Sequence, residues 1–326
     1  MIPSLIGAVV IIANLQLASA IHAQETVRVP RIGYISGRDA ASPGPLVAAF
    51  RQGLAKLGYV EGKNIVVEYR FSATESEVFQ RLIGELLHLK VDVMVVPLQV
   101  VTAKRLVKTT PIVMVSNMNP VDSGLVPNLA RPGGNITGVT TLSRPLTNKR
   151  LELLKEIVPQ ITRIGILRNT NDLSNSLLRM REIETAAHDV NLKGQVIDVH
   201  GSQPDLEGAF GAAAKLQLDA LLTLTPMLIN HQKRIAELAI EHRLPSAFEG
   251  STWVEAGGLM SYSADEPEVF RRAAGYVDKI LKGVKPAELP VEEPTKFEFV
   301  INRKTAKALN LKISDAVLRR ADRVIR

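Results

Sequence analysis

The chain contains no cysteine, so thiolate catalysis and cysteine-ligated metal sites are excluded. Histidine is then the residue type to consider first for catalysis or metal binding. A histidine can act as a general base or a metal ligand, but both roles need partners at a defined spacing. The six histidines are isolated, and neither an H-x-H nor an H-E-x-x-H pattern occurs. The sequence also lacks a G-x-S-x-G elbow, a P-loop and a G-x-G-x-x-G fingerprint. We therefore expect no catalytic residue, no metal site, no cofactor and no enzymatic activity.

Polar residues gather instead directly after the segments that are predicted as strands. Hydroxyl and amide groups dominate, and these groups form hydrogen bonds without changing protonation state, which suits reversible capture of a solute. Arg38 could hold a ligand carboxylate, Glu249 could hold an amine, and Trp253 could stack on a ligand or pack at the edge of a domain. The predicted ligand-binding residues are Ser36, Gly37, Arg38, Leu98, Gln99, Ser116, Asn117, Asn119, Asn169, Thr170, Asn171, Thr225, Glu249, Trp253 and Tyr262.

The Asn, Ser and Thr residues of this set have an alternative role. The same side chains cap helices, and a helix is expected after most of these strands. Their convergence at several strand ends favours a ligand site, since ligands of open parallel sheets bind at the carboxyl ends of the strands.

The elements that position these residues alternate along the chain between short apolar runs and helical spacing. Leu46, Phe50 and Leu54, for example, recur on one helical face after the apolar run at residues 31–35. This alternation predicts βαβ units and parallel sheets covered on both faces. Strands are expected at residues 31–35, 65–69, 91–96, 112–115, 163–167, 195–199, 220–224, 246–248, 259–262 and 297–301. Helices are expected near residues 46–57, 74–86, 101–108, 151–158, 177–190, 206–216, 235–242 and 269–281, with a short one ending at Leu309.

A segment rich in Pro and Gly, residues 127–138, divides this pattern into two halves of similar size, and a hinge is expected around it. The elements after residue 262 are too few for a third domain, so we expect the two halves to share them. The predicted fold is α/β, with two doubly wound parallel-sheet lobes joined by a multi-strand hinge. Lobe 1 is expected at residues 28–140 plus about 263–290, and lobe 2 at residues 141–262 plus about 291–326.

The first 23 residues are predicted to be a signal peptide. Residues 5–13 form an apolar run within the conventional length of about 7–15 residues, short of the roughly 20 that span a bilayer. Cleavage is expected near Ala20 or Ala23, although no Lys or Arg precedes the apolar run. We therefore expect a periplasmic protein, which is not a lipoprotein because it has no cysteine to carry the lipid.

The net charge of +7 raises the possibility of a nucleic-acid partner. The Lys and Arg residues are scattered singly and in pairs, without a basic run interleaved with aromatic residues. We therefore expect a solvated basic surface and no nucleic-acid partner.

Several stretches across the chain match a known family. They are residues 50–54 (FRQGL), 57–64 (LGYVEGKN), 111–113 (PIV), 131–139 (RPGGNITGV), 149–154 (KRLELL), 257–262 (GGLMSY), 280–283 (ILKG) and 294–302 (PTKFEFVIN). In them the chain resembles the ABC transporter substrate-binding proteins that include tryptophan- and tyrosine-type binders. The resemblance implies a type I periplasmic-binding-protein fold, a small-molecule ligand held between the lobes, and closure about the hinge. A solute receptor for import is expected to be a monomer. It also implies an ABC permease and its ATPase as partners, with the membrane contacted only through the permease.

Three positions depart from the family pattern. Residues 97–100 (PLQV) replace a loop of small residues, Asn119 stands where the family often has Asp, and Ser263 stands where it commonly has Gly. An Asp at position 119 would suit a ligand ammonium group. The predicted ligand is therefore a small polar solute, which could be an amino acid or an aromatic or carboxylic compound.

Two other functions are compatible with this fold class. A binding protein of this type could present its ligand to a membrane sensor kinase. An α/β enzyme would need a nucleophile, a base or a metal set, and the sequence provides none at recognisable spacing. A repressor is disfavoured because no helix-turn-helix segment precedes Val27.

Overall fold

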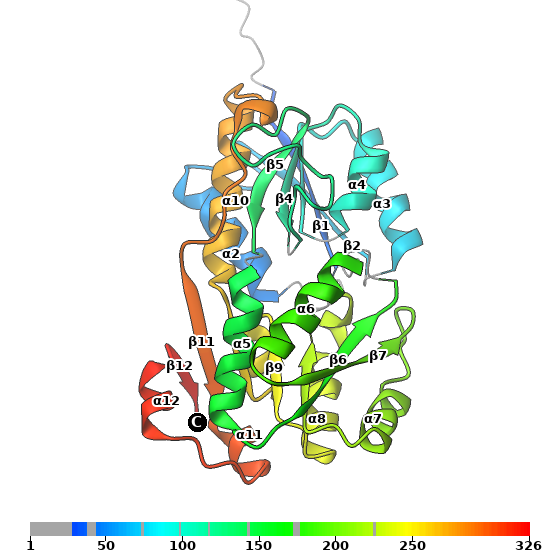
Figure 1. Ribbon diagram of the computed structural model, residues 1–326. Helices are drawn as coiled ribbons and strands as arrows, with labels where there is room; N and C mark the ends of the chain where they lie inside the picture. The colour runs from blue at the N-terminus through cyan, green and yellow to red at the C-terminus, as the bar shows by residue number, and fades with distance from the viewer. Residues whose placement is uncertain are drawn as a thin grey trace, which may run out of the picture.

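The computed structural model describes residues 28–37, 44–72, 75–97, 99–116, 118–141, 144–171, 177–223 and 226–326. These residues form two α/β lobes, one above the other in Figure 1. The prediction of two lobes built on parallel sheets is confirmed. The predicted signal peptide lies outside the described residues.

Lobe 1 contains a five-stranded parallel sheet with the strand order β2-β1-β3-β4-β5. Its strands are β1 (Arg31–Ser36), β2 (Val66–Phe71), β3 (Val93–Val96), β4 (Ile112–Ser116) and β5 (Ile136–Thr140). Helices α2 (Gly44–Lys56) and α10 (Glu266–Leu281) cover one face, and α3 (Ser76–His88) and α4 (Val100–Leu106) cover the other. Because both faces are covered, β3 and β4 are buried along their whole length, which explains their continuous apolar sequences.

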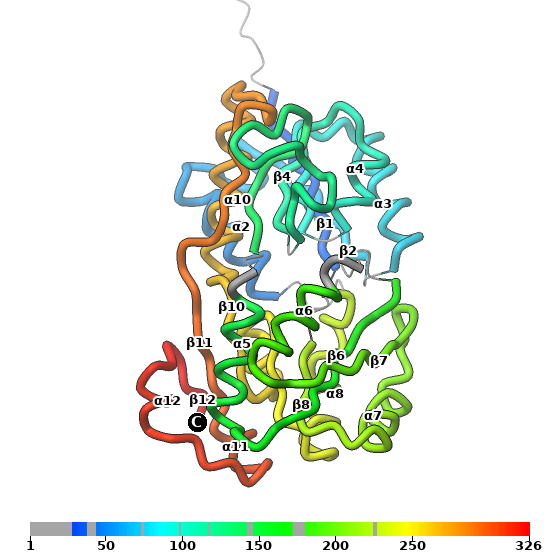
Figure 2. The backbone as a smooth tube through the Cα atoms, in the orientation of Figure 1, coloured from blue at the N-terminus to red at the C-terminus, as the bar shows by residue number. Residues whose placement is uncertain are grey.

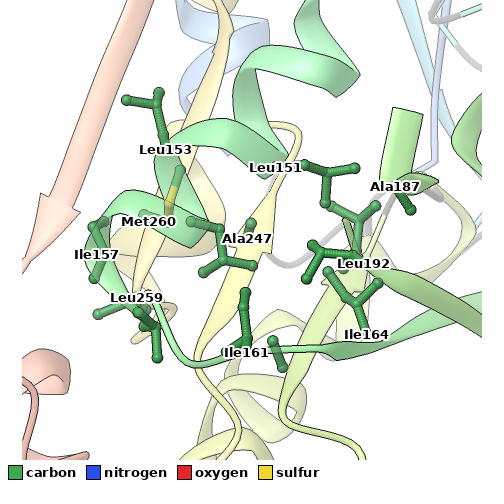
Figure 3. Packing of buried hydrophobic residues seen from close by; sticks show 14 of the residues in the cluster. Leu151, Leu153, Ile157, Ile161, Ile164, Ala187, Leu192, Ala247, Leu259 and Met260 are labelled. Carbon is green, nitrogen blue, oxygen red and sulfur yellow. The ribbon is translucent and has the colours of Figure 1, made fainter. Parts of the chain in front are cut away.

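Lobe 2 contains a seven-stranded sheet with the strand order β12-β11-β10-β9-β8-β6-β7. Its strands are β6 (Arg163–Asn169), β7 (Lys193–Val199), β8 (Ala220–Thr223), β9 (Ser246–Phe248), β10 (Met260–Ala264), β11 (Phe297–Asn302) and β12 (Arg323–Ile325). One face packs against α5 (Arg144–Ile157), α6 (Leu177–Asp189), α11 (Arg303–Ala308) and α12 (Asp315–Arg320). The other packs against α7 (Leu206–Lys215), α8 (Gln232–Glu241) and α9 (Ser251–Glu255). Figure 3 shows the first of these cores, where Leu151 and Ile157 lie near Ala247 and Met260.

One strand pair of lobe 2 is antiparallel, which the sequence analysis did not anticipate. Strand β11 pairs antiparallel with β10 and parallel with β12. The reason is the path of the chain: it leaves lobe 2 at the end of β10, forms α10 in lobe 1, and returns as β11 in the opposite direction.

The chain passes between the lobes three times, after β5, after β10 and before β11 (Figure 2). Backbone hydrogen bonds join these connections. Thr140 N donates to Glu292 O at 2.9 Å, Glu292 N donates to Gly138 O at 3.0 Å, and Asp265 N donates to Lys296 O at 3.0 Å. Three neighbouring connections of this kind form a multi-strand hinge.

The hinge expected around residues 127–138 is therefore misplaced. Residues 127–135 form a loop of lobe 1, fixed by hydrogen bonds from Asn135 Nδ2 to Thr110 O and from Gly133 N to Ala287 O, on the η2 turn (Pro286–Glu288). Strand β5 then extends the sheet of lobe 1 before the chain crosses. Thr and Gly residues interrupt the apolar run of β5, so apolar runs alone did not predict this strand.

Candidate ligand site between the lobes

The carboxyl ends of strands from both sheets face the other lobe. Strand β1 ends at Ser36, and the carbonyl oxygen of the next residue, Gly37, accepts a hydrogen bond of 3.1 Å from Asn230 Nδ2. Asn230 lies on the 3-10 helix η1 (Pro226–His231), which follows β8 of lobe 2. This bond joins the segment after β1 of lobe 1 to the segment after β8 of lobe 2, so the carboxyl ends of the two sheets are in contact here. Ligands of open α/β sheets bind at such edges.

Gln99 lies at the carboxyl end of β3 and has two unusual features. Its backbone adopts the left-handed conformation with a φ of 54° just before α4. Its Nε2 atom is buried and has no hydrogen-bond partner among the described residues. An unpaired buried N–H group costs about 1–3 kcal/mol, which an acceptor on a bound molecule would offset. The Gln99 Nε2 donor is therefore unused within the described part of the chain.

Three buried hydroxyl groups of lobe 2 also lack a partner within the described chain: Thr223 Oγ1, Ser261 Oγ and Ser263 Oγ. In the sheet, Thr223 is paired with Phe248, and Phe248 with Ser261, so these side chains share one face. Ser263 is one of the departures from the family pattern, whereas Thr223 and Ser261 are outside the predicted set. Their apolar flanking residues gave no signal that could have found them.

Two predicted residues of lobe 1 use their side chains locally. Ser116 Oγ accepts a hydrogen bond from Met118 N at 3.1 Å. Asn119 Oδ1 accepts from Val121 N and Asp122 N, at 3.0 and 3.2 Å. These bonds are typical of the capping alternative, in which the polar side chain satisfies a turn of its own backbone. The Asn119 amide nitrogen is not used in these bonds.

The predicted residues at the end of β6 and directly after it likewise use their side chains in local hydrogen bonds. Asn169 is fully buried, and its amide donates to Gly201 O at 2.8 Å while its Oδ1 accepts from Asn171 N at 3.0 Å. Thr170 Oγ1 lies 2.7 Å from His200 Nδ1. These contacts tie the loop after β6 to the loop after β7. They hold the carboxyl end of the sheet in place.

An ion pair rigidifies the same edge. Arg168 on β6 forms a bidentate pair with Asp198 on β7, with distances of 2.6 Å from Nε and 2.8 Å from Nη2. The hydrogen bond from Arg168 lowers the pKa of Asp198 below its usual range, and the same bond raises the pKa of Arg168.

The remaining described members of the predicted set lie around β9 and β10. Trp253 is 6% exposed and stacks on Phe248, with 5.0 Å between ring centroids, so its ring belongs to the core of lobe 2. Tyr262 stacks on Phe297, and its carbonyl oxygen accepts a bond of 2.8 Å from Arg150 Nε. Glu249 is half-buried just after β9. Four predicted residues lie outside the described part of the chain: Arg38, Leu98, Asn117 and Thr225.

The described residues also bear on metal and membrane sites. They contain no group of three His, Asp or Glu side chains placed to share a metal ion. Within the same described ranges, every helix is too short or too polar to cross a bilayer.

Comparison with known proteins identifies the family. The sequence model of the family described as ABC transporter substrate binding protein matches residues 41–325. The chain belongs to this family. As a substrate-binding protein of the ABC transporter type, it has a small molecule as its ligand and a permease as its partner.

Several known proteins are similar to this substrate-binding protein in sequence or in fold. It is 25% identical to a tyrosine-binding protein of Clostridioides difficile (strain R20291) over 267 residues, which are 80% of this chain and 75% of the relative. The crystal structure of a conserved domain protein from Vibrio cholerae is 26% identical, with a TM-score of 0.80 over 91% of this chain and 100% of that one. An ABC domain in complex with L-Trp from Streptococcus pneumonia is 23% identical, with a TM-score of 0.82 over 91% of this chain and 99% of that one. The periplasmic-binding-protein fold is thereby confirmed.

Proposed function

We propose that this substrate-binding protein is exported to the periplasm and captures a small polar solute between its lobes for import by an ABC permease and its ATPase. The observation that carries the proposal is the pairing of two strand ends across the lobes, with Asn230 Nδ2 on Gly37 O. A ligand that contacts both edges at once favours the closed arrangement, so closure is a shift of population about the three-stranded hinge. The protein acts as a monomer, and the permease is its partner in the membrane.

The ligand that we propose is an amino acid or another small aromatic or carboxylic compound. One relative is named a tyrosine-binding protein, and the solved structure of another similar protein is a complex with L-Trp. These two names support an aromatic amino acid as the ligand. Asn119 provides no negative charge for an ammonium group, and its Oδ1 is used in a turn. The free Nε2 donor of Gln99 suits a carboxylate or carbonyl oxygen of the ligand. These features favour recognition of the acid end of the solute over its amine.

A thermal-shift screen of the purified protein tests the proposal. The panel contains L-tyrosine, L-tryptophan, the other amino acids, purines, and small aromatic and carboxylic acids. A compound present at 100 times its Kd stabilises the folded protein by about 2.7 kcal/mol, which is a readily measured shift of Tm. Enzymatic turnover of a compound, without a shift from any other, would contradict the proposal.

The Gln99→Ala variant localises the binding. Loss of one hydrogen bond to a charged ligand group costs about 1.5–3 kcal/mol, so we expect affinity to fall at least tenfold. Gln217→Ala is the matched control, because Gln217 has a left-handed backbone with a φ of 51° and follows α7 at an exposed position. An equal loss of affinity in both variants would show that Gln99 does not contact the ligand.

A further inference from the structure

A pocket lies at the end of lobe 2 that is remote from lobe 1. Its volume is about 630 Å³, and it is lined by α11, α12 and the segments that follow them. Strand β11 runs antiparallel to β10, so the carboxyl end of β11 lies beside the amino end of β10. Helix α11 follows β11 and therefore lies at the end of the sheet opposite the carboxyl ends of β8 and β10 (Figure 1). This pocket is therefore separate from the candidate ligand site between the lobes.

The pocket is strongly basic. Among the described residues that line it, none is acidic. The cations that line it are Arg303, Lys304, Lys307, Lys312 and Arg326. All five are exposed, and none has an ion-pair partner within the described ranges. Neighbouring arginines differ in this respect: Arg320 pairs with Glu156 at 2.8 Å, and Arg323 pairs with Glu255 at 2.7 Å.

The floor of the pocket is apolar. Leu311, Ile313 and Leu318 contribute to its lining and are only partly exposed. A low-polarity floor reduces solvent screening, so each cation at the rim interacts more strongly with an anion than it would on an open surface. The volume falls within the range of about 300–1,000 Å³ that is usual for sites of small molecules. The combination suits a compact anion with several acceptor oxygens.

Phosphate matches this set of groups better than a single carboxylate does. A phosphodiester carries one negative charge and a phosphomonoester carries up to two, and both present several acceptor oxygens on one centre. The guanidinium groups of Arg303 and Arg326 can each donate two parallel hydrogen bonds to a phosphate group, and the lysines add point charges. We propose that this pocket binds a phosphate-bearing anion, either free in solution or as the headgroup of an anionic phospholipid.

Titration calorimetry of the full chain with inorganic pyrophosphate, at low ionic strength, tests the proposal. We expect the Lys304→Gln/Lys307→Gln double variant to bind at least tenfold more weakly than the wild type. The matched control is Lys63→Gln/Lys108→Gln, which removes the same charge from exposed positions of lobe 1. Both variants should keep the melting temperature of the wild type, because all four side chains are exposed.

Vesicle co-sedimentation separates the two sources of phosphate. Binding to vesicles of phosphatidylglycerol with phosphatidylcholine, lost in the Lys304→Gln/Lys307→Gln variant, would support a lipid headgroup. Binding of pyrophosphate alone would support a soluble anion. The proposal fails if neither probe binds, or if the control pair weakens binding as much as the pocket pair, since the net charge alone would then explain it. Neither outcome depends on the solute that binds between the lobes.

Discussion

Replacing Gly138 with Ala should strongly destabilise lobe 1 at the hinge. Gly138 lies on β5 opposite Met114 of β4, with a φ of 136°, a conformation that L side chains rarely adopt. A Cβ atom there would lie 2.7 Å from Met114 N and closer still to Met114 O. The backbone strain costs about 1–3 kcal/mol. Overpacking against a backbone that cannot rotate away adds about 1–3 kcal/mol. We therefore expect Gly138→Ala to lower the free energy of unfolding by roughly 2–6 kcal/mol.

Urea denaturation measures this change, with Gly84→Ala as the matched control. Gly84 is an exposed residue inside α3, and a Cβ atom there would meet no atom within 4 Å. That substitution should raise stability by about 0.5–1 kcal/mol, because Ala is the better helix former. If Gly138→Ala unfolds at the same urea concentration as the wild type, with an unchanged slope, then β5 can adapt to a side chain and the reasoning about close approach is wrong.

Three further predictions concern single contacts. Asn230→Ala removes the bond to Gly37, and this loss of about 0.5–1.5 kcal/mol should weaken solute binding roughly 2- to 10-fold in a calorimetric titration. An unchanged affinity would exclude a role for the bond in closure. Asp205→Ala removes the cap on Gly208 N at the start of α7 and should cost about 1 kcal/mol in urea denaturation, whereas Asp205→Asn should cost less. Asp198→Asn should lower the free energy of unfolding at neutral pH. Because the pKa of Asp198 is lowered on folding, the difference in this free energy between variant and wild type should shrink as pH falls through and below about 4. A difference that is constant with pH would contradict the assigned ion pair.

The sequence predicted the fold well where apolar runs are buried on both sides. Strands β3 and β4 are apolar along their length, and the helix containing Phe50 shows a clear buried face. The prediction missed β5, where Thr137 and Gly138 interrupt the apolar pattern, and also the short β12 and α12. The antiparallel pairing of β11 depends on the return of the chain from lobe 1, which no local pattern encodes.

The candidate site was harder to predict for a similar reason. The rule that ligands bind at strand ends led to Gln99, whose free donor only the structure shows. The same rule cannot separate a ligand contact from a local cap, and Asn119 and Asn169 form turn bonds of the capping kind. Asn230 was missed because it lies on η1, beyond the end of β8, and meets a residue 193 positions away.

The central claim is that one solute contacts both lobes. Amide hydrogen exchange, with and without the compound that gives the largest thermal shift, tests it most directly. We expect the compound to slow exchange at the strand ends of both lobes, around Gly37 and Gln99 in lobe 1 and around Asn230 in lobe 2. Protection confined to one lobe, or to the basic pocket beside α11, would contradict the claim.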